Sequence, residues 1–212
     1  FSLSEAIIDS PRQLLDIALT TRDEGIEVNM EVTAGAFYSL RERRRNLTGR
    51  TGCGLCGVES LAQALPPPTA VTADCRIAQA AVQRALGELQ AVQALKQQTG
   101  GVHGAAWCNV VGGVELVRED VGRHNALDKL LGALLRDRPA AEGFVLVSSR
   151  ASYEMVAKVA SCNIPVLAAV SAPTSLAIAR SEACGLTLLG FVQQGRQVIY
   201  SGGQRVVREQ VV

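Results

Sequence analysis

The chain has 212 residues, a formal net charge of +1 and a hydrophobic content of 48%, with only 4% aromatic residues. This length suits one large or two small domains, whose core must be filled mainly by Ala, Val and Leu. A net charge so close to zero argues against nucleic acid or a membrane surface as a partner of the whole protein. The long uncharged run 159–179 is interrupted by Pro165 and Pro173, which predicts a strand and a helix rather than a membrane span.

The first part of the chain predicts a small α+β domain over residues 1–65. Ser10-Pro11 has the residue types of a helix start. Residues 26–32 alternate between apolar and polar side chains, which predicts a strand with one buried face. Helical spacing follows over residues 37–47. Because the chain opens without Met, on residues typical of the inside of a larger element, we expect the start of this domain to be missing.

Two cysteines, Cys53 and Cys56, follow in a glycine-rich stretch over residues 49–57. Glycine tolerates backbone conformations that other residues avoid, so the sequence predicts a supple loop, which is unusual for core cysteines. The preceding residues are strongly basic, with Arg41, Arg43, Arg44, Arg45 and Arg50 opposed only by Glu42. Cationic neighbours lower the pKa of a thiol and favour the nucleophilic thiolate. The same cluster is about equally typical of a solvated helix face.

This pair indicates chemistry on sulfur, because in a reducing cytosol such a pair is more often catalytic or metal-binding than a structural disulfide. A structural zinc site needs four ligands, and no second Cys-x-x-Cys exists. A zinc deaminase needs a His-x-Glu motif, which His103-Gly104-Ala105 lacks. A thioredoxin-like pair is expected beside a βαβ pattern, whereas a sulfur relay holds its sulfur as a persulfide. From the residues alone, relay and redox exchange both stay open.

The other four cysteines stand alone, mostly in apolar surroundings, which is typical of buried and inert thiols: Cys75, Cys108, Cys162 and Cys184. A stiff triproline, Pro66–Pro68, marks a domain boundary, with a second domain over residues 69–212. We expect an amphipathic helix over residues 77–95, weakened by Gly87 and ended by Gly100-Gly101. Two apolar runs, joined by Gly112-Gly113, then predict a hairpin over residues 105–117.

Beyond the hairpin, helical spacing over residues 127–134 is followed by apolar strands that alternate with helices. The expected strands are residues 144–147, 164–170, 186–192 and 198–200, and the expected helices are residues 152–160 and 173–183. Strands that are apolar throughout indicate a parallel sheet covered by helices on both faces. The sequence therefore predicts the α/β class.

Ligands of such sheets bind at the carboxyl ends of the strands. Three strand-end loops carry hydroxyl groups, amides or arginines, at residues 148–150, 171–175 and 191–196. Helix N-termini and arginines are common phosphate-binding groups, although Ser and Thr are also ordinary helix caps. Three such loops on one edge favour a phosphate-bearing ligand. A fourth loop, residues 118–125, includes His124, which contacts a ligand or orients the loop.

Three longer motifs, at residues 49–57, 119–129 and 148–155, resemble the FdhD/NarQ family, the formate dehydrogenase accessory sulfurtransferases. The likeness extends over nearly the whole chain. It implies a three-layer α/β/α fold similar to that of cytidine deaminases, without their zinc. A smaller α+β part, which carries the Cys-x-x-Cys loop, would precede this fold. The resemblance also implies a cytoplasmic homodimer.

The resemblance further implies that a cysteine desulfurase loads sulfur onto Cys53 as a persulfide, with Cys56 as its partner. The acceptor would be the molybdenum (or tungsten) bis(molybdopterin guanine dinucleotide) cofactor, which formate dehydrogenase needs in sulfurated form. Its binding residues would be Phe191, Val192, Gln193, Gln194, Gly195 and Arg196, and we expect Ser148 and His124 to contribute and GDP to act as a partial mimic. Two alternatives stay open, a thiol–disulfide oxidoreductase and a cofactor-binding chaperone without sulfur chemistry.

Overall fold

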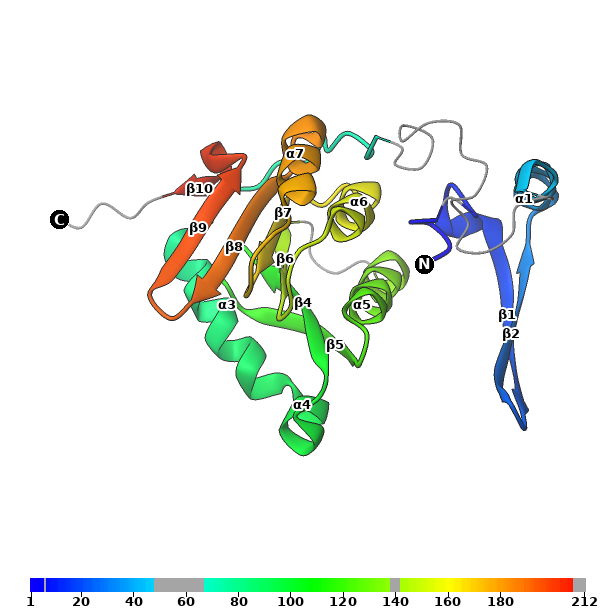
Figure 1. The fold of residues 1–212 in the computed structure, drawn as a ribbon, viewed down its shortest axis with the longest axis horizontal. Coiled ribbons are helices and arrows are strands. Elements are labelled where there is room, and N and C mark those ends of the chain that lie inside the picture. The colour runs from blue at the N-terminus through cyan, green and yellow to red at the C-terminus, as the bar shows by residue number, and fades with distance from the viewer. Residues whose placement is uncertain (6, 48–66, 138–141, 208–212) are drawn as a thin grey trace. The chain divides into compact units, whose positions relative to one another are not determined.

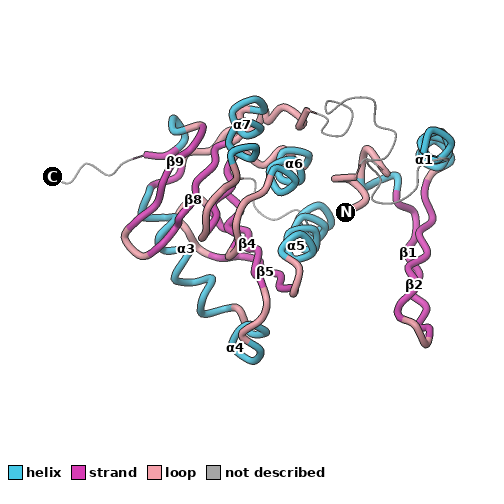
Figure 2. Tube along the Cα trace, viewed as in Figure 1, coloured by secondary structure: helices cyan, strands magenta, loops and turns pink. Residues whose placement is uncertain are grey.

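The structure is a computed structural model that describes residues 1–5, 7–47, 67–137 and 142–207 (Figures 1 and 2). The chain divides into two compact units, Phe1–Pro66 and Pro67–Val212. We refer to them as the N-terminal and C-terminal units and describe each by itself. None of the helices in the described ranges is both long and apolar enough to cross a membrane.

The N-terminal unit contains a β-hairpin and a helix. The helix start predicted at Ser10-Pro11 is present, because the Ser10 hydroxyl caps Arg12, but it opens only a single 3-10 turn, η1 (Pro11–Gln13). The hairpin strands β1 (Leu14–Arg22) and β2 (Gly25–Val32) pair antiparallel, and α1 (Ala34–Leu47) follows. The helix agrees with the spacing predicted over residues 37–47.

The prediction that one face of β2 is buried is wrong. The strand forms where the alternation placed it, yet Ile26, Val28 and Met30 are 68%, 54% and 42% exposed. The physical reason is that alternation shows which side chains share a face but not whether another layer covers it. The two strands of a hairpin hydrogen-bond to each other along their edges, so neither strand covers the apolar face of the other.

The C-terminal unit is built on a six-stranded sheet with the order β5-β4-β6-β7-β8-β9. Its strands are β4 (His103–Asn109), β5 (Val114–Asp120), β6 (Gly143–Val147), β7 (Val166–Ala169), β8 (Thr187–Gln193) and β9 (Arg196–Ser201). The central strands β6, β7 and β8 are parallel, as predicted. The outer pairs are antiparallel, so the sheet is mixed rather than parallel throughout. Short hairpin turns join β4 to β5 and β8 to β9, and such turns enforce antiparallel pairing.

Helices cover both faces of this sheet (Figure 1). On one face lies α3 (Gln79–Val92), whose apolar side packs on Ala106, Leu146 and Leu189. On the other lie α5 (Arg123–Asp137), α6 (Tyr153–Ser161) and α7 (Ser175–Cys184), which pack on alternate residues of the same strands, including Val145 and Leu188. Strands with two buried faces must be apolar throughout, which confirms the predicted α/β class.

The helix predicted over residues 77–95 is divided in the structure. Ile77 belongs to the short strand β3 (Ile77–Ala78), which pairs parallel with β10 (Val206–Val207) after the turn η2 (Gly203–Arg205). The helix α3 runs through Gly87 without interruption, and α4 (Ala94–Thr99) then ends at Gly100 in the left-handed conformation, as predicted. Packing of the apolar side of α3 therefore outweighs the low helix propensity of one exposed glycine.

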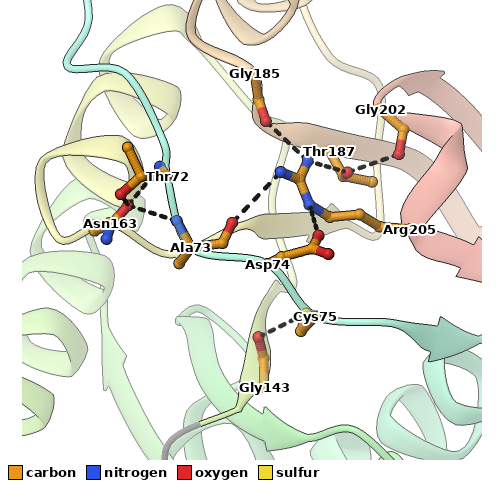
Figure 3. A network of polar contacts seen from close by, with 10 residues as sticks. All are labelled: Thr72, Ala73, Asp74, Cys75, Gly143, Asn163, Gly185, Thr187, Gly202 and Arg205. Carbon is orange, nitrogen blue, oxygen red and sulfur yellow. Dashed lines mark hydrogen bonds and ion pairs between the residues drawn. The ribbon is translucent and has the colours of Figure 1, made fainter.

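A polar network holds the first residues of the C-terminal unit against the amino ends of β6, β7 and β8 (Figure 3). We call residues 71–75 with their partners the amino-edge clasp. The Asn163 side-chain oxygen accepts the N–H groups of Thr72 and Ala73 at 2.8 and 3.1 Å. The backbone N–H of Val71 donates to the Cys184 carbonyl at 2.8 Å. These bonds fix the chain as it leaves the triproline connector.

Arg205 completes the clasp from the other end of the unit (Figure 3). Its guanidinium donates to the Asp74 carboxylate at 2.7 Å, to the Gly185 carbonyl at 2.9 Å and to the Thr187 hydroxyl at 3.2 Å. A longer bond of 3.4 Å reaches the Ala73 carbonyl. One side chain, only 11% exposed, therefore joins the chain before the sheet to the chain after it.

We predict that Arg205→Ala lowers the free energy of unfolding by about 2 kcal/mol, because four acceptors lose a largely buried charged donor. Arg84→Ala is the matched control. Arg84 is also ion-paired, but its side chain is 59% exposed, so its loss should cost under about 0.5 kcal/mol. Urea denaturation measures both values. Equal losses in the two variants would show that Arg205 acts only as a surface charge.

Candidate functional site

The carboxyl ends of β6, β7 and β8 lie together at the edge of the sheet opposite the clasp, and we call this the carboxyl edge. Backbone hydrogen bonds join the loops that follow these strands. The N–H of Ser171 donates to the Ser149 carbonyl at 3.3 Å, and the N–H of Phe191 donates to the Ser171 carbonyl at 3.2 Å. The three loops predicted from the sequence therefore form one continuous rim.

Ser148 lies at the end of β6 and is tied to β4. Its hydroxyl oxygen accepts the N–H of Gly104 at 2.8 Å, and its own N–H donates to the Gly104 carbonyl at 2.9 Å. A hydroxyl that accepts one hydrogen bond still has its own hydrogen to donate. Ser148 thus has a structural role in joining the strands and retains a donor for a ligand.

The starts of α6 and α7 differ in how they are capped. Thr174 caps α7 in the ordinary way, accepting the N–H of Ala177 at 3.2 Å. Ser152 stands at the same position of α6 but makes no side-chain cap. Its hydroxyl instead lies 3.3 Å from Nε2 of His124. Simple capping therefore explains the hydroxyl at α7 and does not explain the one at α6.

His124 connects the first turn of α5 to the first turn of α6. Its Nε2 atom lies 3.3 Å from the Ser152 hydroxyl and 3.6 Å from the Glu154 carboxylate. Burial raises the pKa of Glu154, but the Ser152 hydroxyl and His124 outweigh burial and hold this pKa below its ordinary value. The hydroxyl and the carboxylate both lie next to the same ring nitrogen. In a Ser–His–carboxylate relay, the serine and the carboxylate contact different nitrogens of the ring. The arrangement therefore orients the histidine and does not activate a serine.

The segment 191–196 forms the end of one strand and the turn into the next, in agreement with the strands predicted over residues 186–192 and 198–200. β8 continues to Gln193, and the chain turns back into β9 at Arg196. Phe191 has a φ of 49°, at an irregularity in the register between Gly190 and Gln193. A bulky residue in the left-handed region costs on the order of 1–3 kcal/mol and requires support from its surroundings.

The support for this irregularity comes from close packing around Gly190. A Cβ atom at that position would lie 2.6 Å from Cδ of Pro173, so only glycine lets the β7–α7 loop approach β8. Val192 is fully buried on the α3 face, which leaves only its backbone to contact a ligand. The residues at the tip of the hairpin, from Gln193 to Arg196, are exposed.

Gln83 of α3 holds the tip of this hairpin, and the sequence contains no local signal for it. Its side-chain oxygen accepts the N–H of Gly195 at 2.8 Å. Its amide nitrogen donates to the Arg196 carbonyl at 3.2 Å and to the Gln197 side chain at 2.8 Å. The turn is thus fixed to the opposite layer of the fold, by a contact between residues more than a hundred positions apart.

Two exposed arginines lie on the carboxyl edge. Arg150 and Arg196 are exposed there, and within the described ranges neither arginine makes an ion pair with a carboxylate. Arginines of this kind bind phosphate through two parallel hydrogen bonds. The edge therefore suits a ligand that carries phosphate groups.

The predicted thiols, Cys53 and Cys56, lie outside the described residues, as do Arg43 to Arg45 in their side chains and Arg50 entirely. Three of the remaining cysteines are buried, and Cys162 is half-buried. Burial raises the pKa of Cys75 to about 11 and that of Cys108 to about 12, which keeps both thiols protonated near neutral pH. Among the described residues, no three His, Cys, Asp or Glu side chains are grouped so as to hold a metal ion.

Comparison with known proteins gives consistent results over nearly the whole chain. The model of the FdhD/NarQ family matches residues 1–207. A protein of Cupriavidus necator named sulfur carrier protein FdhD is 51% identical over 210 residues, which are 99% of this chain and 73% of that protein. A protein of the same name from Xanthomonas campestris pv. campestris (strain B100) is 51% identical over 207 residues, which are 97% of this chain and 74% of that protein.

A solved structure supports the same relationship. The crystal structure described as that of a formate dehydrogenase accessory protein from Desulfotalea psychrophila superposes with a TM-score of 0.69 at 25% sequence identity. The match covers 94% of this chain and 74% of that one.

His103, at the start of β4, provides a test of the electrostatics of this edge. Burial, followed by the positive charges of Arg123 and Lys96, lowers its pKa below the ordinary 6.5. The unfolded chain then binds the proton more readily than the folded chain, so stability is lost as the pH falls through 6.5. We predict that the wild type loses more stability between pH 7.5 and 5.5 than His103→Asn, which retains His124 as an internal control. Urea denaturation at both pH values measures this; parallel losses would contradict the lowered pKa.

Proposed function

Because this chain belongs to the FdhD/NarQ family, we propose that it is a sulfurtransferase that passes sulfur from a cysteine desulfurase to a molybdenum cofactor. The acceptor is the bis(molybdopterin guanine dinucleotide) form that formate dehydrogenase requires. The observation that carries the proposal is the 51% identity to proteins named sulfur carrier protein FdhD, in a chain with a Cys-x-x-Cys pair at Cys53 and Cys56.

The chemistry of the carrier is an exchange at sulfur. The Cys53 thiolate attacks the outer sulfur of the donor's persulfide, and the donor cysteine leaves as a thiolate. Sulfur then rests on Cys53 as a persulfide. Attack by the Cys56 thiolate on the inner sulfur of that persulfide releases hydrosulfide and forms a Cys53–Cys56 disulfide. Oxidation of the two thiols to the disulfide supplies the two electrons that convert sulfane sulfur into the sulfide taken up by the cofactor.

The carboxyl edge supports a nucleotide-bearing acceptor. Ser148 retains a hydroxyl donor, and the exposed guanidinium groups of Arg150 and Arg196 have no carboxylate partner in the described part of the chain. The exposed residues Gln193, Gln194 and Gly195, with Phe191 and the backbone of Val192, complete the proposed binding segment. His124, held by Ser152, contacts the same rim. GDP would occupy part of this site, because it carries the guanine and diphosphate groups of the cofactor.

We also propose that the layered sheet is related to that of cytidine deaminases without their zinc, and that the protein works in the cytoplasm as a homodimer with the desulfurase and formate dehydrogenase as partners. The family relationship supports these points. A thiol–disulfide oxidoreductase and a binding-only chaperone remain the rival functions, and both are separated from sulfur transfer by the next experiment.

We predict that incubation with a cysteine desulfurase and cysteine adds one reducible sulfur atom to Cys53, seen by mass spectrometry of the peptide. Cys53→Ala should abolish the addition and the activation of formate dehydrogenase, whereas Cys162→Ala should do neither. An oxidoreductase would show a reversible disulfide without added sulfur. A chaperone would activate formate dehydrogenase even as Cys53→Ala. Either outcome would replace the sulfur-transfer proposal.

A further inference from the structure

The tip of the β8–β9 hairpin is held only weakly by its own strands. Cross-strand pairs run as far as Gly190 with Val198, and the next and last pair joins Gln193 to Arg196. The register shifts between these two pairs, where Phe191 has a φ of 49°. An irregularity of this kind interrupts the ladder of hydrogen bonds and bends the strand. The tip, with one pair and a turn, therefore needs a second attachment to keep a single position.

Gln83 of α3 provides this attachment through two backbone groups of the tip. Its side-chain oxygen accepts the N–H of Gly195 at 2.8 Å, and its amide nitrogen donates to the Arg196 carbonyl at 3.2 Å. The N–H must find an acceptor and the carbonyl must find a donor. A carboxamide presents one of each, whereas a carboxylate has only acceptors and an ammonium group only donors. The two backbone groups therefore determine both the chemistry of this side chain and the orientation of its amide.

The contacts of Gln83 lie on both sides of the Arg196 Cα atom. The Gly195 N–H precedes it in the chain, and the Arg196 carbonyl follows it directly. The same amide nitrogen of Gln83 also donates to the Gln197 side-chain oxygen at 2.8 Å. The backbone from which the Arg196 side chain extends is thus fixed in position and direction.

Gln83 is itself attached to a rigid part of the fold. It lies in α3 beside Val82, which is fully buried, and Ala85 and Leu86 of the next turn are buried in the same core cluster. This cluster packs the helix on the sheet face that it covers. The tip of the hairpin is therefore held from a buried helix and not from another surface loop.

The consequence for ligand binding concerns the Arg196 guanidinium. It is exposed and forms no ion pair with a carboxylate in the described part of the chain, so it is available to a phosphate group. A binding group that is ordered before the ligand arrives loses less freedom on binding, which strengthens affinity. We propose that Gln83 is a positioning residue of the nucleotide site, which acts through Arg196 by holding the hairpin tip in its binding conformation. This inference rests on the proposed function.

The test is a double-mutant cycle on GDP binding, measured by calorimetric titration of the whole chain. Gln83→Met keeps a side chain of similar length and helix propensity but removes both hydrogen-bonding groups. We expect it to weaken GDP binding by about threefold to tenfold in the wild-type background. In the Arg196→Gln background it should weaken binding by less than about twofold, because the group it positions is already lost. The matched control is Gln90→Met on the exposed side of the same helix, which should bind GDP like the wild type.

The second measurement is the exchange of the Gly195 amide proton with solvent, followed by NMR without ligand. Gly195 is exposed, yet its N–H should exchange slowly in the wild type because it is hydrogen-bonded to Gln83. Gln83→Met should speed this exchange by about tenfold, while the amide of Leu167 in the central strand β7 is unchanged. A loss of overall stability would instead speed the exchange of both amides.

The outcomes separate this inference from the proposed function. Equal weakening by Gln83→Met in both backgrounds would overturn it, because Gln83 would then act on something other than Arg196. An unprotected Gly195 amide in the wild type would overturn it without any variant. If Arg196→Gln weakens GDP binding and Gln83→Met does not, only this inference fails. If GDP does not bind the wild type, the proposed nucleotide site fails as well. Thermal melting of each variant confirms that it is folded.

Discussion

The parallel pairing of β6, β7 and β8 is the constraint on which the rest of the C-terminal unit depends. Parallel strands bring their carboxyl ends to one edge, and the crossover helices α6 and α7 must then begin at that edge. Burial of both faces holds the strands in place, because α3 covers one side and α5, α6 and α7 cover the other. This arrangement brings the hydroxyls and arginines of the rim to one edge of the sheet.

The opposite edge of the sheet, at the amino ends of the strands, anchors the chain. There the amino-edge clasp fixes the chain immediately after the triproline connector, through Asn163 and Arg205. The clasp thereby joins the chain that precedes the sheet to the chain that follows it.

The sequence predicts the interior of this fold better than its outer parts. Apolar runs such as residues 144–147 are dictated by burial on both faces, and they appear as strands where expected. The direction of the outer strands depends on short turns, and the exposure of Ile26, Val28 and Met30 depends on which other layer is present. Local patterns contain neither kind of information.

The site shows the same division between local and long-range information. Ser148 and His124 are candidates that the sequence alone indicates, because hydroxyls and histidines at strand ends and helix starts stand out in it. Gln83 acts on the hairpin tip through partners more than a hundred residues away, as Arg205 does on Asp74 at the opposite edge. Long-range pairing leaves no pattern in a single sequence.

Hydrogen–deuterium exchange with and without GDP tests whether the nucleotide substrate is bound at the carboxyl edge. Binding there predicts slower exchange of amides in residues 148–152, 171–174 and 190–196 when GDP is present, with residues 71–75 of the clasp unchanged. Protection of residues 71–75, with no change in the three strand-end segments, would contradict it.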